Sequence, residues 1–257
     1  WRILKILFAF VQAVHLVLKL KPSIVVGFGG YPSFAPALAA QMLGRQVLIH
    51  EQNAVLGRAN RVLCRLGAHL ATTFGGTRGV SKSTQARTRK VGNPVRNDVL
   101  TAARGGYRYL NASRPFELLI FGGSQGASVF ADTVPAAIGE LPADLKARLR
   151  VVHQVRRADM AQTLAAYGEI GVYAEIRDFF DDLPSRMRRA HLVICRGGAS
   201  TVCELSLLGA PAIIVPLPGA LDQDQAHNVR ELNEKGEHHA PCIDEWSTMF
   251  DEAGDAP

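Results

Sequence analysis

Three glycine-rich turns constrain the fold of this chain more than any other feature. They lie at residues 27–33, 122–127 and 195–204, and each separates a short apolar run from a segment of helical character. Short apolar runs bounded by turn residues are typical of buried strands, and strand–turn–helix units repeated along a chain are typical of parallel α/β sheets. Glycine lets a ligand approach the backbone, and the free N–H groups at a helix start suit a phosphate. One such turn would be weak evidence, but three indicate an α/β protein with a phosphate-bearing ligand.

The third turn has the most informative arrangement. Residues 191–194 form the preceding apolar run, and Gly209 is placed to end the helix that follows. Glu204 falls one turn into this helix, where its carboxylate can accept hydrogen bonds from hydroxyl groups such as those of a ribose. An ordinary strand–turn–helix with a glycine for packing is the alternative, and this segment alone does not decide between the two.

Charge divides the chain into two parts. Residues 1–97 contain 14 lysines and arginines and one acid, a net charge of +13, whereas residues 98–257 contain 15 and 22, a net charge of −7. The change coincides with turn residues at 91–97, which predicts two domains, 1–97 and 98–257. A basic half can face an anionic membrane or a phosphorylated substrate. Aromatic and basic residues do not alternate as in RNA-binding proteins, so nucleic acid is not an expected partner.

The first twenty residues predict a helix that is apolar nearly all round. Basic residues such as Arg2, Lys5 and Lys19 interrupt it, and its apolar runs are much shorter than a membrane span requires. A core helix and a helix that docks on anionic lipid both fit this pattern. Residues 75–90 are rich in Gly, Ser, Thr and Arg without periodicity, and they predict a mobile basic loop.

Neither a metal site nor a disulfide is expected. The four cysteines have no metal-ligand spacing, and we interpret them as free thiols of a reducing compartment. Asp222 and Asp224 form a DxD pattern at the start of a predicted helix. We interpret this pair as acceptors for sugar hydroxyls and as a helix cap, not as metal ligands.

Two motifs of the first half lie where ligands are expected. Residues 27–30 resemble a dinucleotide fingerprint with Glu51 about twenty residues later, but Pro32 occupies the position of its third glycine. An NAD-dependent oxidoreductase is therefore the weaker interpretation, and a loop that binds phosphate through its backbone is the stronger. His50 to Asn53 follow the next strand directly, at the strand end where α/β folds place ligands.

Five motifs in a fixed order resemble the MurG family, the peptidoglycan N-acetylglucosaminyltransferases that convert lipid I to lipid II. They are GFGGYPS at 27–33, HEQN at 50–53, GNPVR at 92–96, GGSQGA at 122–127 and CRGGASTVCE at 195–204. The resemblance extends over roughly residues 1–236. It implies an α/β protein of the GT-B type, with two Rossmann-like parallel-sheet domains facing a cleft and the N-terminal domain incomplete. The first domain would take the lipid-linked acceptor, and the second would bind UDP-GlcNAc.

The resemblance also implies an activity. GlcNAc would pass from UDP-GlcNAc to the C4 hydroxyl of MurNAc in lipid I, with inversion and without a cofactor or a protein-held metal. The enzyme would be peripheral at the cytoplasmic face of the bacterial inner membrane, on its anionic surface.

Particular residues take roles from the resemblance. Arg96 and Ser124 would meet the diphosphate, Phe180 the uracil through its backbone, and Glu204 the ribose, while Asp224 stands where the family often has glutamine. The residues expected to bind UDP-GlcNAc are Asn53, Arg96, Ser124, Phe180, Ala199, Ser200, Thr201, Glu204 and Gln225. The expected acceptor or phosphate loop comprises Gly27, Gly29, Gly30, Tyr31, His50 and Glu51.

The chain departs from the family pattern at both ends. The family begins with a further βα unit whose glycine-rich loop carries a histidine proposed as a catalytic group, and that loop does not occur here. Residues 237–257 do not resemble the family's closing helices. We therefore expect a fragment with weak or absent turnover, and no catalytic residue is assigned. A nucleotide-sugar-binding module without catalysis is the remaining alternative.

Overall fold

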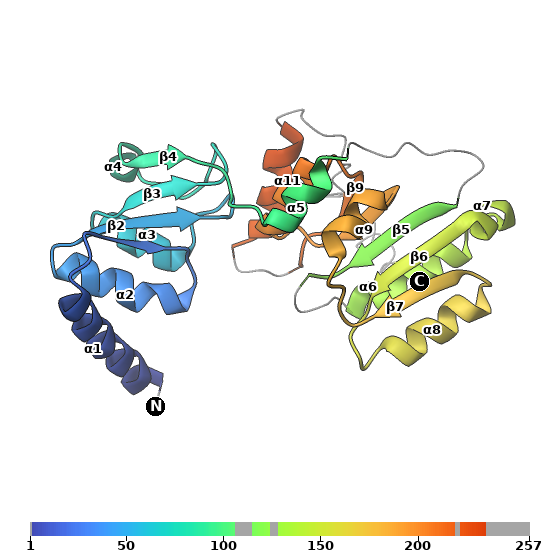
Figure 1. Ribbon diagram of the computed structural model, residues 1–257, viewed down its shortest axis with the longest axis horizontal. Coiled ribbons are helices and arrows are strands. Elements are labelled where there is room, and N and C mark those ends of the chain that lie inside the picture. Colours follow the sequence, from blue (N-terminus) through green and yellow to red (C-terminus); the bar gives the residue numbers. More distant parts are fainter. Residues whose placement is uncertain (1, 106–114, 124–127, 219–221, 235–257) are drawn as a thin grey trace, which may run out of the picture. The chain divides into compact units, whose positions relative to one another are not determined.

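The computed structural model describes residues 2–105, 115–123, 128–218 and 222–234 (Figure 1). Two parallel sheets, one of four strands and one of five, each belong to a compact unit. Unit 1 comprises Trp1–Pro94 and Ala220–Glu231, and unit 2 comprises Val95–Gly219 and Leu232–Pro257. The predicted α/β class with two parallel sheets is confirmed.

Unit 1 contains a sheet of order β1-β2-β3-β4, with all of its neighbouring strands parallel. Helices α2 and α3 pack against its first two strands (Figure 1). Its elements are α1 (Arg2–Leu20), β1 (Ile24–Gly27), α2 (Tyr31–Met42), β2 (Gln46–Glu51), α3 (Arg58–Arg65), β3 (His69–Thr72), α4 (Lys82–Gln85) and β4 (Thr88–Lys90).

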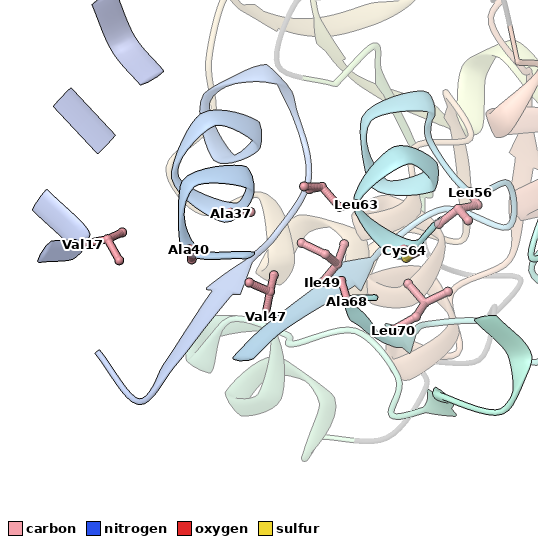
Figure 2. Packing of buried hydrophobic residues seen from close by; sticks show 10 residues of the cluster. All are labelled: Val17, Ala37, Ala40, Val47, Ile49, Leu56, Leu63, Cys64, Ala68 and Leu70. Carbon is pink, nitrogen blue, oxygen red and sulfur yellow. The ribbon is translucent and has the colours of Figure 1, made fainter. Parts of the chain in front are cut away.

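The core of unit 1 lies between β2 and the helices that cover it (Figure 2). Ile49 of β2 and Leu63 of α3 are fully buried there. Alanines 37 and 40 of α2 let Val17 of α1 approach closely, so one face of α1 is part of the core. Small side chains at a helix contact shorten the distance between the axes.

The other face of α1 leaves apolar side chains in solvent. Phe8, Val11 and Leu20 are 65%, 60% and 65% exposed. Within the part of the chain that the structure describes, none of the helices is both long enough and apolar enough to cross a lipid bilayer. The predicted helix is thus confirmed, with a core-facing side and an exposed apolar side.

Unit 2 contains a sheet of order β7-β6-β5-β8-β9, again with parallel neighbours. The chain moves outward from β5 in one direction through β6 and in the other through β8, so a topological switch point lies between β5 and β8. The elements are α5 (Asn97–Ala103), β5 (Phe116–Phe121), α6 (Ser128–Gly139), α7 (Ala143–Arg148), β6 (Leu149–Gln154), α8 (Met160–Glu169), β7 (Tyr173–Arg177), α9 (Leu183–Arg189), β8 (Leu192–Cys195), α10 (Ala199–Leu208) and β9 (Ala212–Ile214).

The last described helix, α11 (Asp224–Glu234), follows β9 in the sequence. Its residues up to Glu231 nevertheless group with unit 1. The charge balance placed residues 98–257 in one domain, whereas the structure separates the units after Pro94 and groups 220–231 with unit 1. Charge patterning describes partners and solubility and does not determine which core a helix packs on.

The prediction of an irregular loop at residues 75–90 is wrong. Helix α4 and strand β4 lie within it. Ser81 caps α4, its Oγ accepting a hydrogen bond from the Thr84 N–H at 3.2 Å. Strand β4 is three residues long and pairs with β3 as an edge strand. Such a short edge strand has no room for a hydrophobic period, so the sequence pattern gave no sign of it.

Three of the predicted free thiols are described, and all three are free. They are Cys64, Cys195 and Cys203. Burial raises the pKa of Cys64 to about 11 and that of Cys195 further. Both of these thiols are therefore protonated and unreactive at neutral pH.

Candidate functional site

Unit 1 has a cleft at the carboxyl ends of β1 and β2, with a volume of about 250 Å³. The β1–α2 turn, the β2–α3 loop and the first turn of α3 form most of its wall. Its lining residues are Gly29, Gly30, Tyr31, Glu51, Gln52, Asn53, Gly57, Arg58, Ala59, Asn60 and Asp222. The structure thus brings together predicted residues from both first-half motifs.

The glycine turn before α2 needs its glycines. Gly29 and Gly30 have φ of +80° and +76°, a region that side chains disfavour. Gly29 also lies close to Asn60, whose Nδ2 would be 3.3 Å from an added Cβ. Ser33 Oγ lies 2.7 Å from the Gly29 carbonyl, to which it donates, and Gln52 Nε2 donates to the Phe28 carbonyl at 2.8 Å. Tyr31, the first residue of α2, lines the cleft, whereas Pro32 has no N–H group to offer there.

Glu51 is held by its own loop. Its carboxylate is 2% exposed. It accepts hydrogen bonds from Asn53 N at 3.1 Å, Asn53 Nδ2 at 3.3 Å, Gly57 N at 2.9 Å and Asn60 Nδ2 at 2.7 Å. A carboxylate has about four acceptor sites, so these donors occupy them. A dinucleotide site needs free acceptors for ribose hydroxyls, and this arrangement disfavours the oxidoreductase alternative.

His50 and Asn53 also have structural partners. His50 is 4% exposed, and its Nε2 lies 2.8 Å from the Gly92 carbonyl, so Nε2 carries the proton. Asn228 of α11 is fully buried, accepts from the Ala54 N–H at 2.7 Å and donates to Asn53 Oδ1 at 3.1 Å. Asn228 was not among the site residues expected from the sequence. A polar residue at a buried helix position is the signal that could have identified it.

In unit 2 the corresponding region lies at the carboxyl ends of β5 and β8. Gly198 precedes α10, and none of the side chains that the structure describes caps that helix. Arg196 Nη1 donates to the Val215 and Pro216 carbonyls at 3.2 and 2.8 Å, which ties the turn to the end of β9. Burial lowers the pKa of Arg196. The first N–H groups of α10 therefore stand in a rigid turn at the switch point, where α/β folds bind ligands.

Glu204 and Arg96 form an ion pair within unit 2. Arg96 Nε lies 3.4 Å from Glu204 Oε1, and Arg96 Nη1 lies 3.5 Å from Asp98 Oδ2. The Glu204 side chain is 13% exposed and that of Arg96 is 59% exposed. Burial raises the pKa of Glu204, while Arg96 opposes the shift. A carboxylate with a raised pKa beside an exposed cation is characteristic of a ligand site.

The other predicted donor residues divide between the units. Ala199 is buried, Thr201 is half-buried and Ser200 is exposed in the first turn of α10. Phe180 is a buried residue of the loop between β7 and α9 in unit 2. Gln225 lies at the start of α11 in unit 1. Ser124 lies outside the described residues.

Comparison with known proteins identifies the family. The model for the glycosyltransferase family 28 N-terminal domain matches residues 1–72, and that for the C-terminal domain of the same family matches residues 117–241. The crystal structure of Acinetobacter baumannii MurG aligns with a TM-score of 0.72 and 32% identity, covering 93% of this chain and 66% of that one. The chain belongs to the MurG family of glycosyltransferase family 28. The resemblance seen in the motifs is confirmed, and with it the GT-B fold.

Curated members of the MurG family align closely with the chain. One, from Methylobacterium sp. (strain 4-46), is 53% identical over 228 residues, which is 88% of this chain and 61% of the relative. Another, from Rhodopseudomonas palustris (strain BisB18), is 48% identical over 225 residues, 88% of this chain and 60% of the relative. Both are named as UDP-N-acetylglucosamine–N-acetylmuramyl-(pentapeptide) pyrophosphoryl-undecaprenol N-acetylglucosamine transferase. The chain spans about 61% of the length of the curated relatives it matches.

A more distant neighbour shares the fold alone. The Neisseria meningitidis UDP-GlcNAc 2-epimerase, solved bound to UDP-GlcNAc, aligns with a TM-score of 0.58 and 13% identity, covering 89% of this chain and 72% of that chain.

Proposed function

We propose that this chain is the nucleotide-sugar-binding part of an inverting N-acetylglucosaminyltransferase. The donor is UDP-GlcNAc, the acceptor is the C4 hydroxyl of MurNAc in lipid I, and the product is lipid II. The observation that carries the proposal is the start of α10 at the switch point, where no side chain among the described residues caps the helix, with Glu204 one turn further on and paired with Arg96. The printed names of relatives about half identical to this chain support the same substrates.

The donor occupies the carboxyl edge of the unit 2 sheet. The diphosphate lies at the first N–H groups of α10 and at the turn after β5, with Arg96 and Ser124 beside it. Glu204 accepts hydrogen bonds from the ribose hydroxyls. Arg96 therefore exchanges its Glu204 partner for phosphate when the nucleotide binds. Phe180 meets the uracil through its backbone.

The transfer is a single displacement. The acceptor oxygen forms a bond to the anomeric carbon while the bond from that carbon to the β-phosphate oxygen breaks, and the electron pair leaves with UDP. The helix start and Arg96 stabilise the charge that develops on the leaving diphosphate. The acceptor hydroxyl loses its proton to a base that these residues do not identify.

The acceptor side is the cleft of unit 1. Its glycine turn and the start of α2 suit a phosphate of the lipid-linked substrate. The exposed apolar face of α1, with Lys19 at its end, suits the surface of an anionic membrane. The protein is therefore proposed to work at the cytoplasmic face of the bacterial inner membrane as a peripheral protein.

Calorimetric titration of the chain with UDP-GlcNAc, and separately with NAD, tests the donor assignment. We expect binding of UDP-GlcNAc, no binding of NAD, and a large loss of UDP-GlcNAc affinity in Glu204→Ala. Glu140→Ala, an exposed acid of unit 2, is the matched control. NAD binding without UDP-GlcNAc binding would contradict the proposal. Binding of UDP-GlcNAc without transfer to lipid I would agree with the weak or absent turnover expected of this chain and would favour the binding module.

A further inference from the structure

Arg186 of α9 organises a group of side chains that the proposed function does not use. Its Nη1 and Nη2 donate to the two carboxylate oxygens of Glu175 at 2.7 and 3.1 Å, and its Nε donates to Asp182 Oδ1 at 2.7 Å. Its side chain is 13% exposed. The guanidinium carbon lies 4.4 Å from the centre of the Phe180 ring. Both the edge and a face of the guanidinium plane are therefore occupied.

These contacts join three successive segments of unit 2. Glu175 lies in β7, Phe180 and Asp182 in the loop that follows, and Arg186 in α9. A two-pronged arginine–carboxylate pair is charge-assisted and fixes orientation as well as distance. Hydrogen bonding to Arg186 holds the pKa of Glu175 and of Asp182 below their ordinary values. Both carboxylates are therefore charged at neutral pH, and the group stays assembled.

The loop between β7 and α9 depends on this group for its shape. Residues 178–182 read Asp-Phe-Phe-Asp-Asp and contain no glycine or proline to impose a turn. Its further anchor is the Asp178 carbonyl, which accepts a hydrogen bond from Gln154 Nε2 at 3.1 Å. A cation stacked on the Phe180 ring, and bonded to Glu175 in β7 and to Asp182 at the end of the loop, holds the backbone at Phe180 in one position.

The loop lies at the edge of the sheet where the donor is proposed to bind. All strands of the sheet are parallel, so the loop after β7 and the turn after β5 share one edge, two strands apart. Two strand spacings are roughly 10 Å. In the described part of the chain neither the N–H nor the carbonyl of Phe180 has a hydrogen-bond partner. One residue therefore offers one donor and one acceptor to a base.

That pair of groups distinguishes two pyrimidines. Uracil presents an O4 acceptor beside an N3–H donor, which a fixed N–H and carbonyl can both meet. Cytosine presents an N4 amino donor beside an N3 acceptor, the reverse pattern. A backbone held rigidly rejects the reversed pattern because its polar groups would be left unpaired, whereas a loose one can turn to suit either base.

We propose that Arg186 is a positioning residue that fixes the Phe180 backbone and so makes the nucleotide site select uridine over cytidine. The inference rests on the proposed function, which puts the base at Phe180. Arg186 acts through Phe180 and does not touch the nucleotide.

Binding of UDP and of CDP to the wild-type chain, to Arg186→Lys and to Arg189→Lys tests the proposal. Lysine keeps the charge but cannot form the two-pronged pair. We expect Arg186→Lys to lower UDP affinity about tenfold, or about 1.4 kcal/mol, and to move the UDP-to-CDP affinity ratio towards one. Arg189 is the matched control, because it lies on the same helix, is 46% exposed and reaches Asp182 only at 4.0 Å. It should leave both affinities unchanged.

A second variant keeps the proposal testable if Arg186→Lys folds poorly. Glu175→Gln weakens the pair from the strand side and should change the ratio in the same direction, by less. Amide hydrogen exchange at residues 178–182 should become faster in both variants. A general loss of stability would weaken UDP and CDP binding equally and leave the ratio as in the wild type, and that result overturns the proposal.

The two proposals fail in different ways. A wild-type chain that binds UDP, with Arg186→Lys equal to it in affinity and ratio, overturns the role of Arg186 alone. A folded wild-type chain that binds no UDP overturns the proposed function, and the role of Arg186 with it.

Discussion

Two glutamates near the carboxyl ends of the parallel sheets, the buried Glu51 of unit 1 and the half-buried Glu204 of unit 2, have different roles. Glu51 in unit 1 accepts four hydrogen bonds from its own loop. Glu204 in unit 2 meets the exposed Arg96 at 3.4 Å, and burial raises its pKa. The four hydrogen bonds stabilise the charged carboxylate of Glu51. Burial disfavours the charged form of Glu204, and hydrogen bonds from a bound ligand can offset that cost.

We therefore assign Glu51 to the framework that holds its own loop, and Glu204 to the surface that is proposed to bind the ligand. Because hydrogen bonds occupy all the acceptor sites of the Glu51 carboxylate, this side chain fixes the loop that lines the cleft of unit 1. Glu204 keeps acceptor capacity for hydroxyl groups because Arg96 can move away. Its predicted contact with the ribose remains a prediction, as does the predicted ligand contact of Glu51.

Removing the Glu51 carboxylate should have the largest effect. Glu51→Ala leaves four loop donors without their acceptor, and each buried unpaired donor costs about 1–3 kcal/mol unless water reaches it. We expect the free energy of unfolding to fall by about 3 kcal/mol, measured by urea denaturation followed by circular dichroism. Glu140→Ala, an exposed acid, should change it by less than about 0.5 kcal/mol. A loss below about 1 kcal/mol would contradict the assignment of Glu51 to the framework of its loop.

Glu204→Gln should weaken ligand binding without lowering stability, the opposite of the result expected for Glu51→Ala. It removes a charged acceptor of the ribose hydroxyls, and hydrogen bonds to charged groups contribute about 1.5–3 kcal/mol. We expect UDP affinity to fall by at least about tenfold in calorimetric titration. The free energy of unfolding should stay the same or rise, because the buried charge is gone. A variant that is less stable and binds UDP normally would show that Glu204 belongs to the framework.

The pH dependence of stability should differ between Glu204, whose pKa is raised, and Glu175, whose pKa is lowered. Because the pKa of Glu204 is raised above its ordinary 4.5, the folded state holds this proton more tightly than the unfolded state. Its contribution to stability is present below pH 4.5 and is lost as the pH rises through the folded pKa. The wild type should therefore lose stability relative to Glu204→Gln as the pH rises above 4.5 in urea titrations. Glu175, with a lowered pKa, should show the opposite trend against Glu175→Gln, losing its contribution as the pH falls below 4.5.

The smallest effect is expected at the mouth of the unit 1 cleft. Arg58 pairs with Asp222 at 3.5 Å, and their side chains are 65% and 36% exposed. Exposed pairs contribute about 0–1 kcal/mol, so Arg58→Gln should lower the free energy of unfolding by less than about 0.5 kcal/mol. A loss as large as that of Glu51→Ala would mean that this pair also belongs to the framework.

Local signals in the sequence predicted much of the fold and part of the site. The apolar run at 191–194 overlaps β8, in which Val193 and Cys195 are buried. The position of Glu204 one turn into α10 followed from spacing alone. Strand β4 could not be predicted, because its stability comes from pairing with β3 and not from a period of its own.

Local patterns in the chain predict the strand–turn–helix units, their glycine turns and the family to which they belong, because these features depend on residues close together in the sequence. The tertiary structure alone decided which side chains are available. Glu51 is saturated by a loop that folds back over it, Asn228 reaches Ala54 across 174 positions, and Arg186 joins three segments around Phe180. Hydrogen bonding and burial depend on distance in space, and no local pattern encodes that distance.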